Sequence, residues 1–151
     1  MIYKFFLFFI ILLLASCDYK PIYSKKNISN FEITEINLEG NKNIGRMIVP
    51  LLNLNQKKES DSKYTLQLVN NKTVKTVAKD RAGTATVYNT TITSILTMYE
   101  DGQVIKKKTF SENFTYNNVI NKFDLSQYQR NIETNLIIKI SNEILIFLNT
   151  I

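Results

Sequence analysis

Residues 84–116 read TATVYNTTITSILTMYEDGQVIKKKTFSENFTY and predict a long β-hairpin. The first part, Thr84 to Tyr99, is dense in β-branched residues and contains almost no residue that breaks a strand. Asp101-Gly102 follows, a pair typical of a type I′ turn, because both central positions of that turn need positive φ. Val104 to Tyr116 is then the returning strand. Alternation puts the large side chains of the first strand on one face, namely Tyr88, Ile92, Leu96 and Met98.

Two further strands are predicted upstream of this hairpin. Tyr64 to Val69 alternates cleanly between apolar and polar residues and continues to Lys79, after a bulge or turn around residues 70–72. Residues 80–83 then form a turn into the hairpin. Phe31 to Glu39 has nearly the same period, with one slip near Thr34-Glu35 that indicates a bulge.

Helical spacing appears in two places. A short helix capped by Asn43 is expected after Gly40-Asn41, and a long helix is expected from Leu125 to Leu148, opened by Asp124. The apolar residues of the long helix recur every three or four positions and indicate packing against a core. The sequence therefore predicts an α+β two-layer sandwich, a mostly antiparallel sheet of about four strands with two helices packed on one face.

The start of the chain has the layout of a secretory signal peptide. Lys4 is followed by an apolar run from Phe5 to Leu14, which is too short to span a bilayer of about 30 Å. Residues 14–17, Leu-Ala-Ser-Cys, look like a bacterial lipobox, in which the cysteine receives diacylglycerol and the peptide is cut before it. The alternative is an uncleaved anchor with a cysteine nearby. Cys17 is the one cysteine of the sequence, and lipidation explains an odd cysteine in an exported protein.

Cleavage divides the chain into three parts. Residues 1–16 are the signal peptide with the lipobox, residues 17–30 are a lipidated tether, and residues 31–151 form a single α+β domain. Removing the signal peptide from 151 residues leaves 135, the size of one ordinary domain. Because Lys4 is lost, the net charge of +6 becomes +5. This charge is a weak indication of an anionic partner, and no nucleic-acid partner is predicted.

The composition argues against an enzyme. The sequence has no histidine, which excludes Ser-His-Asp and Cys-His nucleophile arrangements and histidine-based zinc sites. The four glycines stand alone rather than in a phosphate-binding loop. Acidic residues are scattered without a recognisable pair, so a carboxylate-dependent enzyme remains a minor alternative. No metal or cofactor is predicted apart from the covalent lipid, a diacylglycerol and an N-acyl chain on Cys17.

The chain resembles the LptE family, lipopolysaccharide-assembly lipoproteins of Gram-negative bacteria. The resemblance is sharpest at residues 14–23, LASCDYKPIY. This stretch is similar to the alphaproteobacterial form of the family. It implies two helices on a mixed four-stranded sheet, and a domain that plugs the lumen of the outer-membrane barrel LptD. Such a protein is no enzyme. It helps the barrel fold, occludes its lumen and binds lipopolysaccharide, while its lipid holds it at the periplasmic face of the outer membrane.

In this family, basic residues near strand ends are implicated in lipopolysaccharide binding. The nearest matches here are Lys79 and Arg81 around the residue 80–83 turn, together with Lys106, Lys107 and Lys108 after the other hairpin turn. Clustered cations of this kind engage phosphates and carboxylates by charge-assisted hydrogen bonds. The alternative for each is an ordinary solvated side chain that discourages edge-to-edge aggregation.

Asp18 complicates the predicted address. In enteric bacteria, an aspartate directly after the lipidated cysteine is similar to an inner-membrane retention signal. An inner-membrane location would favour a second hypothesis, an auxiliary periplasmic lipoprotein of an ABC-type lipid or solute transporter.

Overall fold

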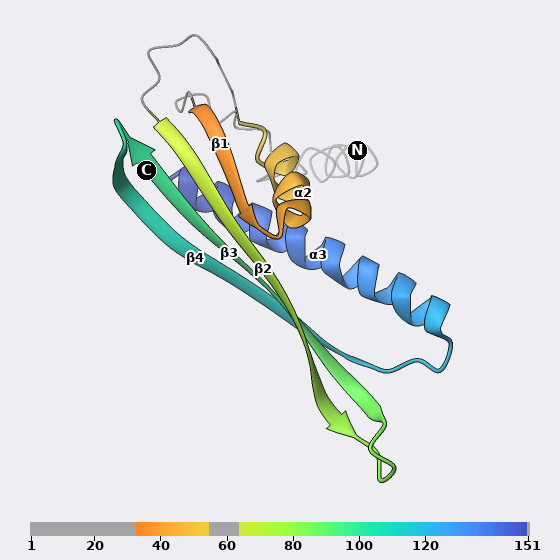
Figure 1. Ribbon diagram of the computed structural model, residues 1–151. Coiled ribbons are helices and arrows are strands. Elements are labelled where there is room, and N and C mark those ends of the chain that lie inside the picture. Colours follow the sequence, from red (N-terminus) through yellow and green to blue (C-terminus); the bar gives the residue numbers. More distant parts are fainter. Residues whose placement is uncertain (1–32, 55–63, 151) are drawn as a thin grey trace, which may run out of the picture.

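The computed structural model describes residues 33–54 and 64–150, which form a four-stranded sheet and two helices (Figure 1). The elements follow in the order β1 (Ile33–Gly40), α2 (Lys42–Leu52), β2 (Tyr64–Lys79), β3 (Ala85–Glu100), β4 (Gln103–Asn117) and α3 (Lys122–Leu148). The strands lie side by side in chain order. β1 is parallel to β2, and the other two pairs are antiparallel. The predicted α+β architecture with a mixed sheet is confirmed.

The two helices and the sheet enclose an apolar core. α2 contacts β1 and β2, α3 contacts β3 and β4, and the helices also contact each other. Figure 1 shows α3 running obliquely across the strands, behind the sheet in that view. Within residues 33–54 and 64–150, the other face of the sheet carries no helix, and it is called here the open face. The buried apolar residues include Ile44, Ile48, Leu66, Leu68, Ile92, Leu96, Met98, Ile132, Leu136, Ile140 and Ile144. Each such side chain contributes about 1.5–3 kcal/mol by leaving water.

Both hairpin turns lie where the sequence predicted them. Asp101 and Gly102 have φ of 48° and 80°, the two positive values of a type I′ turn, and Glu100 pairs directly with Gln103. In the β2–β3 turn, Asp80 Oδ1 accepts hydrogen bonds from the backbone N–H groups of Ala82 and Thr84, at 2.9 and 2.8 Å. The slip predicted in the first strand is also present, as a register shift between Ile33 and Glu35.

Three local predictions were wrong. β2 runs unbroken past residues 70–72, and its register shifts instead between Thr76 and Lys79. α2 is capped by Asn41, whose side chain accepts from the Ile44 N–H at 3.4 Å, rather than by Asn43. α3 is capped by Asn121, which accepts from the Phe123 N–H at 2.9 Å, so the helix starts before Asp124. An asparagine oxygen at the cap satisfies a helix N–H that otherwise lacks a partner.

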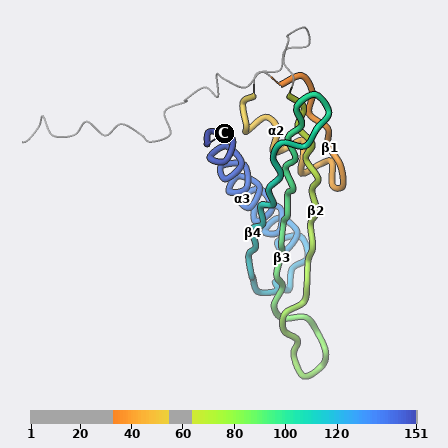
Figure 2. The backbone as a smooth tube through the Cα atoms, turned by 90° about the vertical axis from the view of Figure 1, so that its left-hand side faces the viewer, coloured from red at the N-terminus to blue at the C-terminus, as the bar shows by residue number. Residues whose placement is uncertain are grey.

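The β2–β3 hairpin extends past the end of the core. In β2 the last buried residue is Asn70, and every residue from Val74 to Lys79 is exposed. We call residues 74–86 the distal ribbon. It forms the narrow end of the molecule, beyond the first turn of α3 (Figures 1 and 2).

A buried polar contact marks the boundary between core and ribbon. Ser94 Oγ donates to Asn70 Oδ1 at 2.7 Å, and the Asn41 N–H donates to the Asn70 carbonyl at 2.7 Å. Gly40 lies directly against that carbonyl with φ of +65°, and a Cβ there would stand 2.3 Å from the Asn70 oxygen. Only glycine adopts this close, left-handed approach without strain.

Candidate functional site

Lys79 and Arg81 lie at the tip of the distal ribbon. Both are exposed, Lys79 as the last residue of β2 and Arg81 within the turn. The carboxylate between them, Asp80, is held by the turn's own N–H groups. Within residues 33–54 and 64–150, neither cation has a salt-bridge partner. Their charges therefore face solvent at one end of the molecule.

The other predicted cations lie at the opposite end of the sheet. Lys79 is paired with Ala85, whereas Lys108 is paired with Leu96, about eleven residues further along β3. At about 3.3 Å per residue, the two pairs stand roughly 35 Å apart. The structure thus brings Lys79 and Arg81 together and separates them from Lys106–Lys108. The two groups cannot bind one compact anionic group at the same time.

Lys108 differs from its two neighbours in its contacts. Its ammonium lies 5.3 Å from the ring centroid of Phe110 and 4.9 Å from that of Phe147. The two rings also meet edge to face, with centroids 5.9 Å apart. A cation over aromatic faces contributes about 0.5–2 kcal/mol. Lys108 therefore helps to close the β4 edge against α3.

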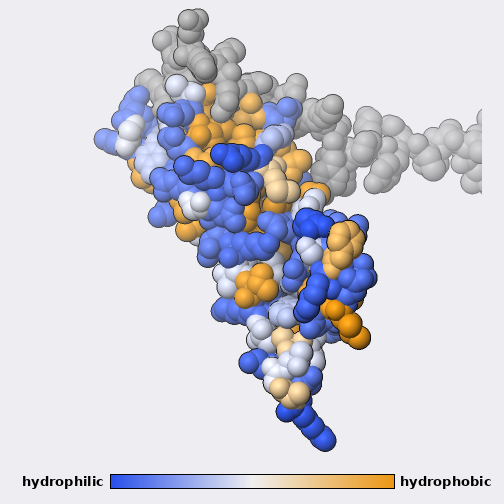
Figure 3. All heavy atoms as spheres, turned by 45° about the vertical axis from the view of Figure 1, so that its right-hand side comes forward, coloured by the Kyte–Doolittle hydropathy of each residue, from blue (hydrophilic) through white to orange (hydrophobic). Residues whose placement is uncertain are grey.

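Several large apolar side chains are exposed near the narrow end. Ile120 is 100% exposed and Phe123 is 70% exposed, both around the start of α3, and Val77 in the ribbon is 59% exposed. We call the end of the molecule opposite the distal ribbon the wide end. In the view of Figure 3, hydrophobic surface is extensive at the wide end and occurs as isolated patches toward the narrow end. No pattern in the sequence marks these three residues as exposed, because their exposure follows from where the helices end over the sheet.

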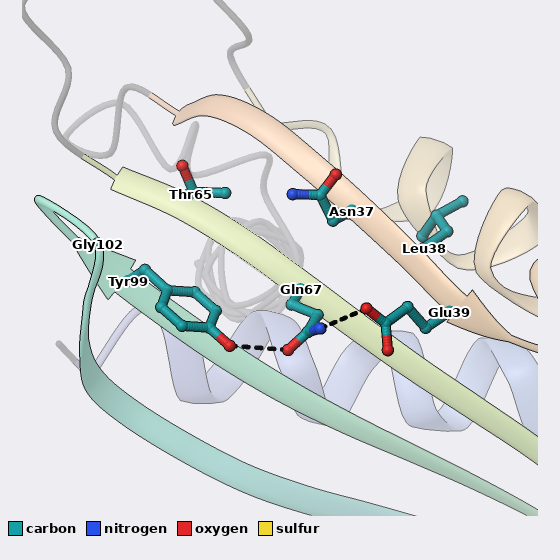
Figure 4. A pocket seen from close by; sticks show the side chains of 7 residues that line it. All are labelled: Asn37, Leu38, Glu39, Thr65, Gln67, Tyr99 and Gly102. Atoms are coloured by element: carbon teal, nitrogen blue, oxygen red, sulfur yellow. Dashed lines mark hydrogen bonds between the residues drawn. The ribbon is translucent and has the colours of Figure 1, made fainter.

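A polar depression of about 420 Å³ lies on the open face near the wide end. Its residues come from β1, β2, β3 and the β3–β4 turn: Asn37, Leu38, Glu39, Thr65, Gln67, Tyr99 and Gly102 (Figure 4). The Tyr99 hydroxyl donates to Gln67 Oε1 at 2.9 Å, and Gln67 Nε2 donates to Glu39 Oε1 at 2.6 Å. The hydrogen-bonded chain therefore links three neighbouring strands.

An apolar groove of about 430 Å³ lies between the edge strand β4 and α3. Its lining is Phe114, Tyr128, Asn131, Ile132, Asn135, Leu136, Ile138 and Lys139. The Lys139 ammonium lies 3.7 Å from a Glu112 carboxylate oxygen, which places an ion pair beside the groove. Phe114 is 43% exposed in this groove, whereas Phe110 and Tyr116, on the same face of β4, are buried.

Two negative observations concern only the part of the chain that the structure describes. There, no group of three or more acidic or cysteine side chains is placed to hold a metal ion. Neither α2 nor α3 is both long and apolar enough for a membrane span. Cys17, Asp18 and the tether lie outside the described residues, as do residues 55–63.

Several solved structures with the same arrangement are described as bacterial lipoproteins. Rare lipoprotein B from Shewanella oneidensis matches with a TM-score of 0.60 and 12% identity, over 78% of this chain and 95% of that one. A minor lipoprotein from Acinetobacter baumannii matches with a TM-score of 0.64 and 10% identity, over 80% and 92%. This chain has the fold of these lipoproteins.

A third similar structure, a Caulobacter crescentus protein described as a lipoprotein, has a TM-score of 0.54 and 16% identity, over 78% of this chain and 88% of that one. No protein-family model and no curated protein sequence matches this chain. The similarity is thus carried by the three-dimensional arrangement rather than by side-chain identity.

Proposed function

We propose that the chain is a lipoprotein of outer-membrane lipopolysaccharide assembly and acts as the partner subunit of an LptD-type barrel. The observation that carries this proposal is the fold shared with several bacterial lipoproteins, together with the lipobox at residues 14–17. The LptE-like run at residues 19–23 narrows it to lipopolysaccharide assembly. The role is one of binding and assembly, without catalysis.

Cys17 is the proposed anchor. A thioether-linked diacylglycerol and an N-acyl chain would supply more than the two hydrocarbon chains that stable membrane attachment requires. Replacing Cys17 with serine is expected to abolish incorporation of labelled fatty acid into the protein. Ser16→Ala, which keeps a small residue before the cysteine, is the matched control and should leave the labelling unchanged.

The open face supports residence inside a barrel. Several of its cross-strand contacts are polar, although Val69 and Ile95 also pair on this face: Thr93 and Ser111 hydroxyls lie 3.1 Å apart, and Asn89 Nδ2 donates to Asn113 Oδ1 at 3.3 Å. The lumen of an outer-membrane barrel is itself polar, so such a face can lie against it without leaving apolar surface in water. The helix-covered face, in contrast, is closed by the domain's own core.

The tip of the distal ribbon is the proposed contact with lipopolysaccharide. Lys79 and Arg81 present two cations to solvent at the narrow end. Phosphates and carboxylates of the glycolipid would form charge-assisted hydrogen bonds with them, and arginine can bind an oxyanion in a bidentate manner. Lys106 and Lys107, roughly 40 Å away along β3, would then contact the barrel or a separate anionic group.

One observation favours a second function. Asp18 directly follows the proposed lipidated cysteine, and an inner-membrane lipoprotein would fit an auxiliary subunit of an ABC-type transporter. Separation of the two membranes on a sucrose gradient distinguishes the functions. Outer-membrane residence and co-purification with a large barrel protein support the first. Stable inner-membrane residence with a transporter as the captured partner would replace it with the second.

A further inference from the structure

The polar depression on the open face has the chemistry of a ligand site rather than of plain solvated sheet. Its central residue, Gln67, is fixed on both sides, by the Tyr99 hydroxyl at 2.9 Å and by the Glu39 carboxylate at 2.6 Å. These two bonds determine which end of the amide is oxygen and which is nitrogen. An amide can form four hydrogen bonds, so one N–H and one acceptor position of Gln67 remain for a ligand.

A second amide stands beside the first. Asn37 is the direct register partner of Gln67 in the parallel β1–β2 pair, so the two side chains leave the same face about 4.8 Å apart. Figure 4 shows Asn37, Gln67 and the Tyr99 ring arranged around the depression. Thr65, the register partner of Tyr99, adds a hydroxyl. The lining therefore alternates hydrogen-bond donors and acceptors beside one aromatic ring.

The charge of the depression restricts what it can hold. Among the seven described residues that line it, Glu39 is the one acidic residue and none is lysine or arginine. Phosphate and carboxylate groups are repelled by that carboxylate and meet no cation among these described residues. The fitting ligand is uncharged and rich in groups that both donate and accept hydrogen bonds. Vicinal hydroxyls of a sugar ring match a fixed amide in this way, and the C–H face of the ring can pack on an aromatic side chain.

We propose that this depression binds a neutral sugar residue, at a site separate from the cations at the strand ends. Glu39 and the two amides hold the hydroxyls, and Tyr99 both positions Gln67 and supplies the stacking surface. The inference rests on the geometry of β1, β2 and β3, and it is tested on the protein without a barrel, so its failure and that of the proposed function are distinguishable.

Saturation-transfer NMR on the full-length lipoprotein tests this directly. The protein is kept in a phosphocholine detergent, which has no sugar headgroup, and is offered glucose, galactose and N-acetylglucosamine at millimolar concentration. At least one of these sugars is expected to receive saturation. Glucose 6-phosphate should bind at least fivefold more weakly than glucose, because Glu39 repels the phosphate.

Amino-acid substitutions test whether the saturation transfer comes from the depression. Gln67→Leu and Asn37→Ala should each reduce it at least fivefold, while Thr109→Ala, an exposed substitution on β4 of the same face, should leave it unchanged. Circular dichroism checks that each variant is folded. If Gln67→Leu does not fold, the result for Asn37→Ala decides the test. The proposal is overturned if none of the sugars receives saturation, or if the signal survives in a folded depression variant. In either case the Tyr99–Gln67–Glu39 chain is a cross-strand brace over a hydrated surface.

Discussion

The two ends of the β2–β3 hairpin are made of similar residues, but one end is buried and the other is exposed to solvent. At the wide end, Leu66, Leu68 and Leu96 are buried beneath the helices. At the narrow end, the same two strands continue as the distal ribbon, where Val74 is 46% and Val77 59% exposed. β propensity alone therefore does not decide which part of a strand is core. The position of the helices determines which part is buried. β2 leaves the core at Asn70, the residue whose carbonyl accepts from the N-cap residue of α2.

The two ends of the hairpin also have different roles in the domain. An isolated two-stranded hairpin is marginally stable in water, so the ribbon depends on the core for its order. In return, its exposed tip can carry cations that a packed core would not tolerate unpaired. Changes in the core should therefore alter stability, and changes at the tip should alter binding.

The largest expected effect comes from emptying the core. Ile140 is fully buried in the middle of α3, and Ile140→Ala should lower the free energy of unfolding by about 2–5 kcal/mol, through lost transfer energy and a residual cavity. Val77→Ala in the ribbon is the matched control and should change it by less than about 0.5 kcal/mol. Urea unfolding of both variants measures the difference. Equal losses would mean that the ribbon is as much part of the core as α3.

The boundary itself should be nearly as sensitive. Gly40→Ala places a Cβ 2.3 Å from the Asn70 carbonyl at a φ of +65°, so both a clash and backbone strain are introduced. We expect a loss of about 2–4 kcal/mol. Gly83→Ala has a similar φ of +83° but meets no atom within 4 Å, and it should lose only about 1 kcal/mol. Thermal unfolding compares the two, and a Gly83 variant that is the less stable one would contradict the assigned boundary.

A smaller effect is expected at the ion pair that ties β2 to α3. Lys72 Nζ lies 2.5 Å from Glu133 Oε2, with both side chains partly exposed. A double-mutant cycle with Lys72→Met and Glu133→Gln should give a coupling energy of about 0.5–1 kcal/mol that declines with added salt. A coupling near zero at low salt would show that α3 holds β2 here by apolar contacts alone.

The smallest effect on stability should accompany the largest effect on binding. Lys79→Glu combined with Arg81→Glu changes two exposed residues and should alter the unfolding free energy by less than about 0.5 kcal/mol. Lipopolysaccharide binding by the purified protein should nevertheless fall about tenfold or more, because two favourable charges become repulsive. Lys106→Glu with Lys107→Glu is the charge-matched control at the far end. Unchanged binding in the tip variant would return Lys79 and Arg81 to ordinary solvated residues.

Local signals in the sequence predicted much of this fold. Asp101-Gly102 predicted a two-residue turn, because few residue pairs tolerate two positive φ values, and the slip at Thr34-Glu35 predicted a real bulge. The interruption expected at Asn70 did not occur. There a polar residue that suggests a turn in isolation is held inside a continuous strand by Ser94, a partner 24 positions away. The sequence contains both residues but not their contact.

The site was less predictable than the fold for the same reason. Glu39, Gln67 and Tyr99 each look like an ordinary polar-face residue of its own strand, and only strand register brings them together. Likewise, the sequence predicts both Lys79 and Lys108 to be exposed cations and does not distinguish between them. The pairing of β3 separates them by roughly 35 Å and places Lys108 over two aromatic rings.

The proposed function is lipopolysaccharide assembly together with an outer-membrane barrel. The most direct measurement is the amount of lipopolysaccharide at the cell surface during controlled depletion of the protein, with a wild-type copy and a Cys17→Ser copy supplied in parallel. The account predicts that surface lipopolysaccharide falls on depletion and is restored by the wild-type copy far better than by the Cys17→Ser copy. Normal surface lipopolysaccharide after full depletion would contradict it.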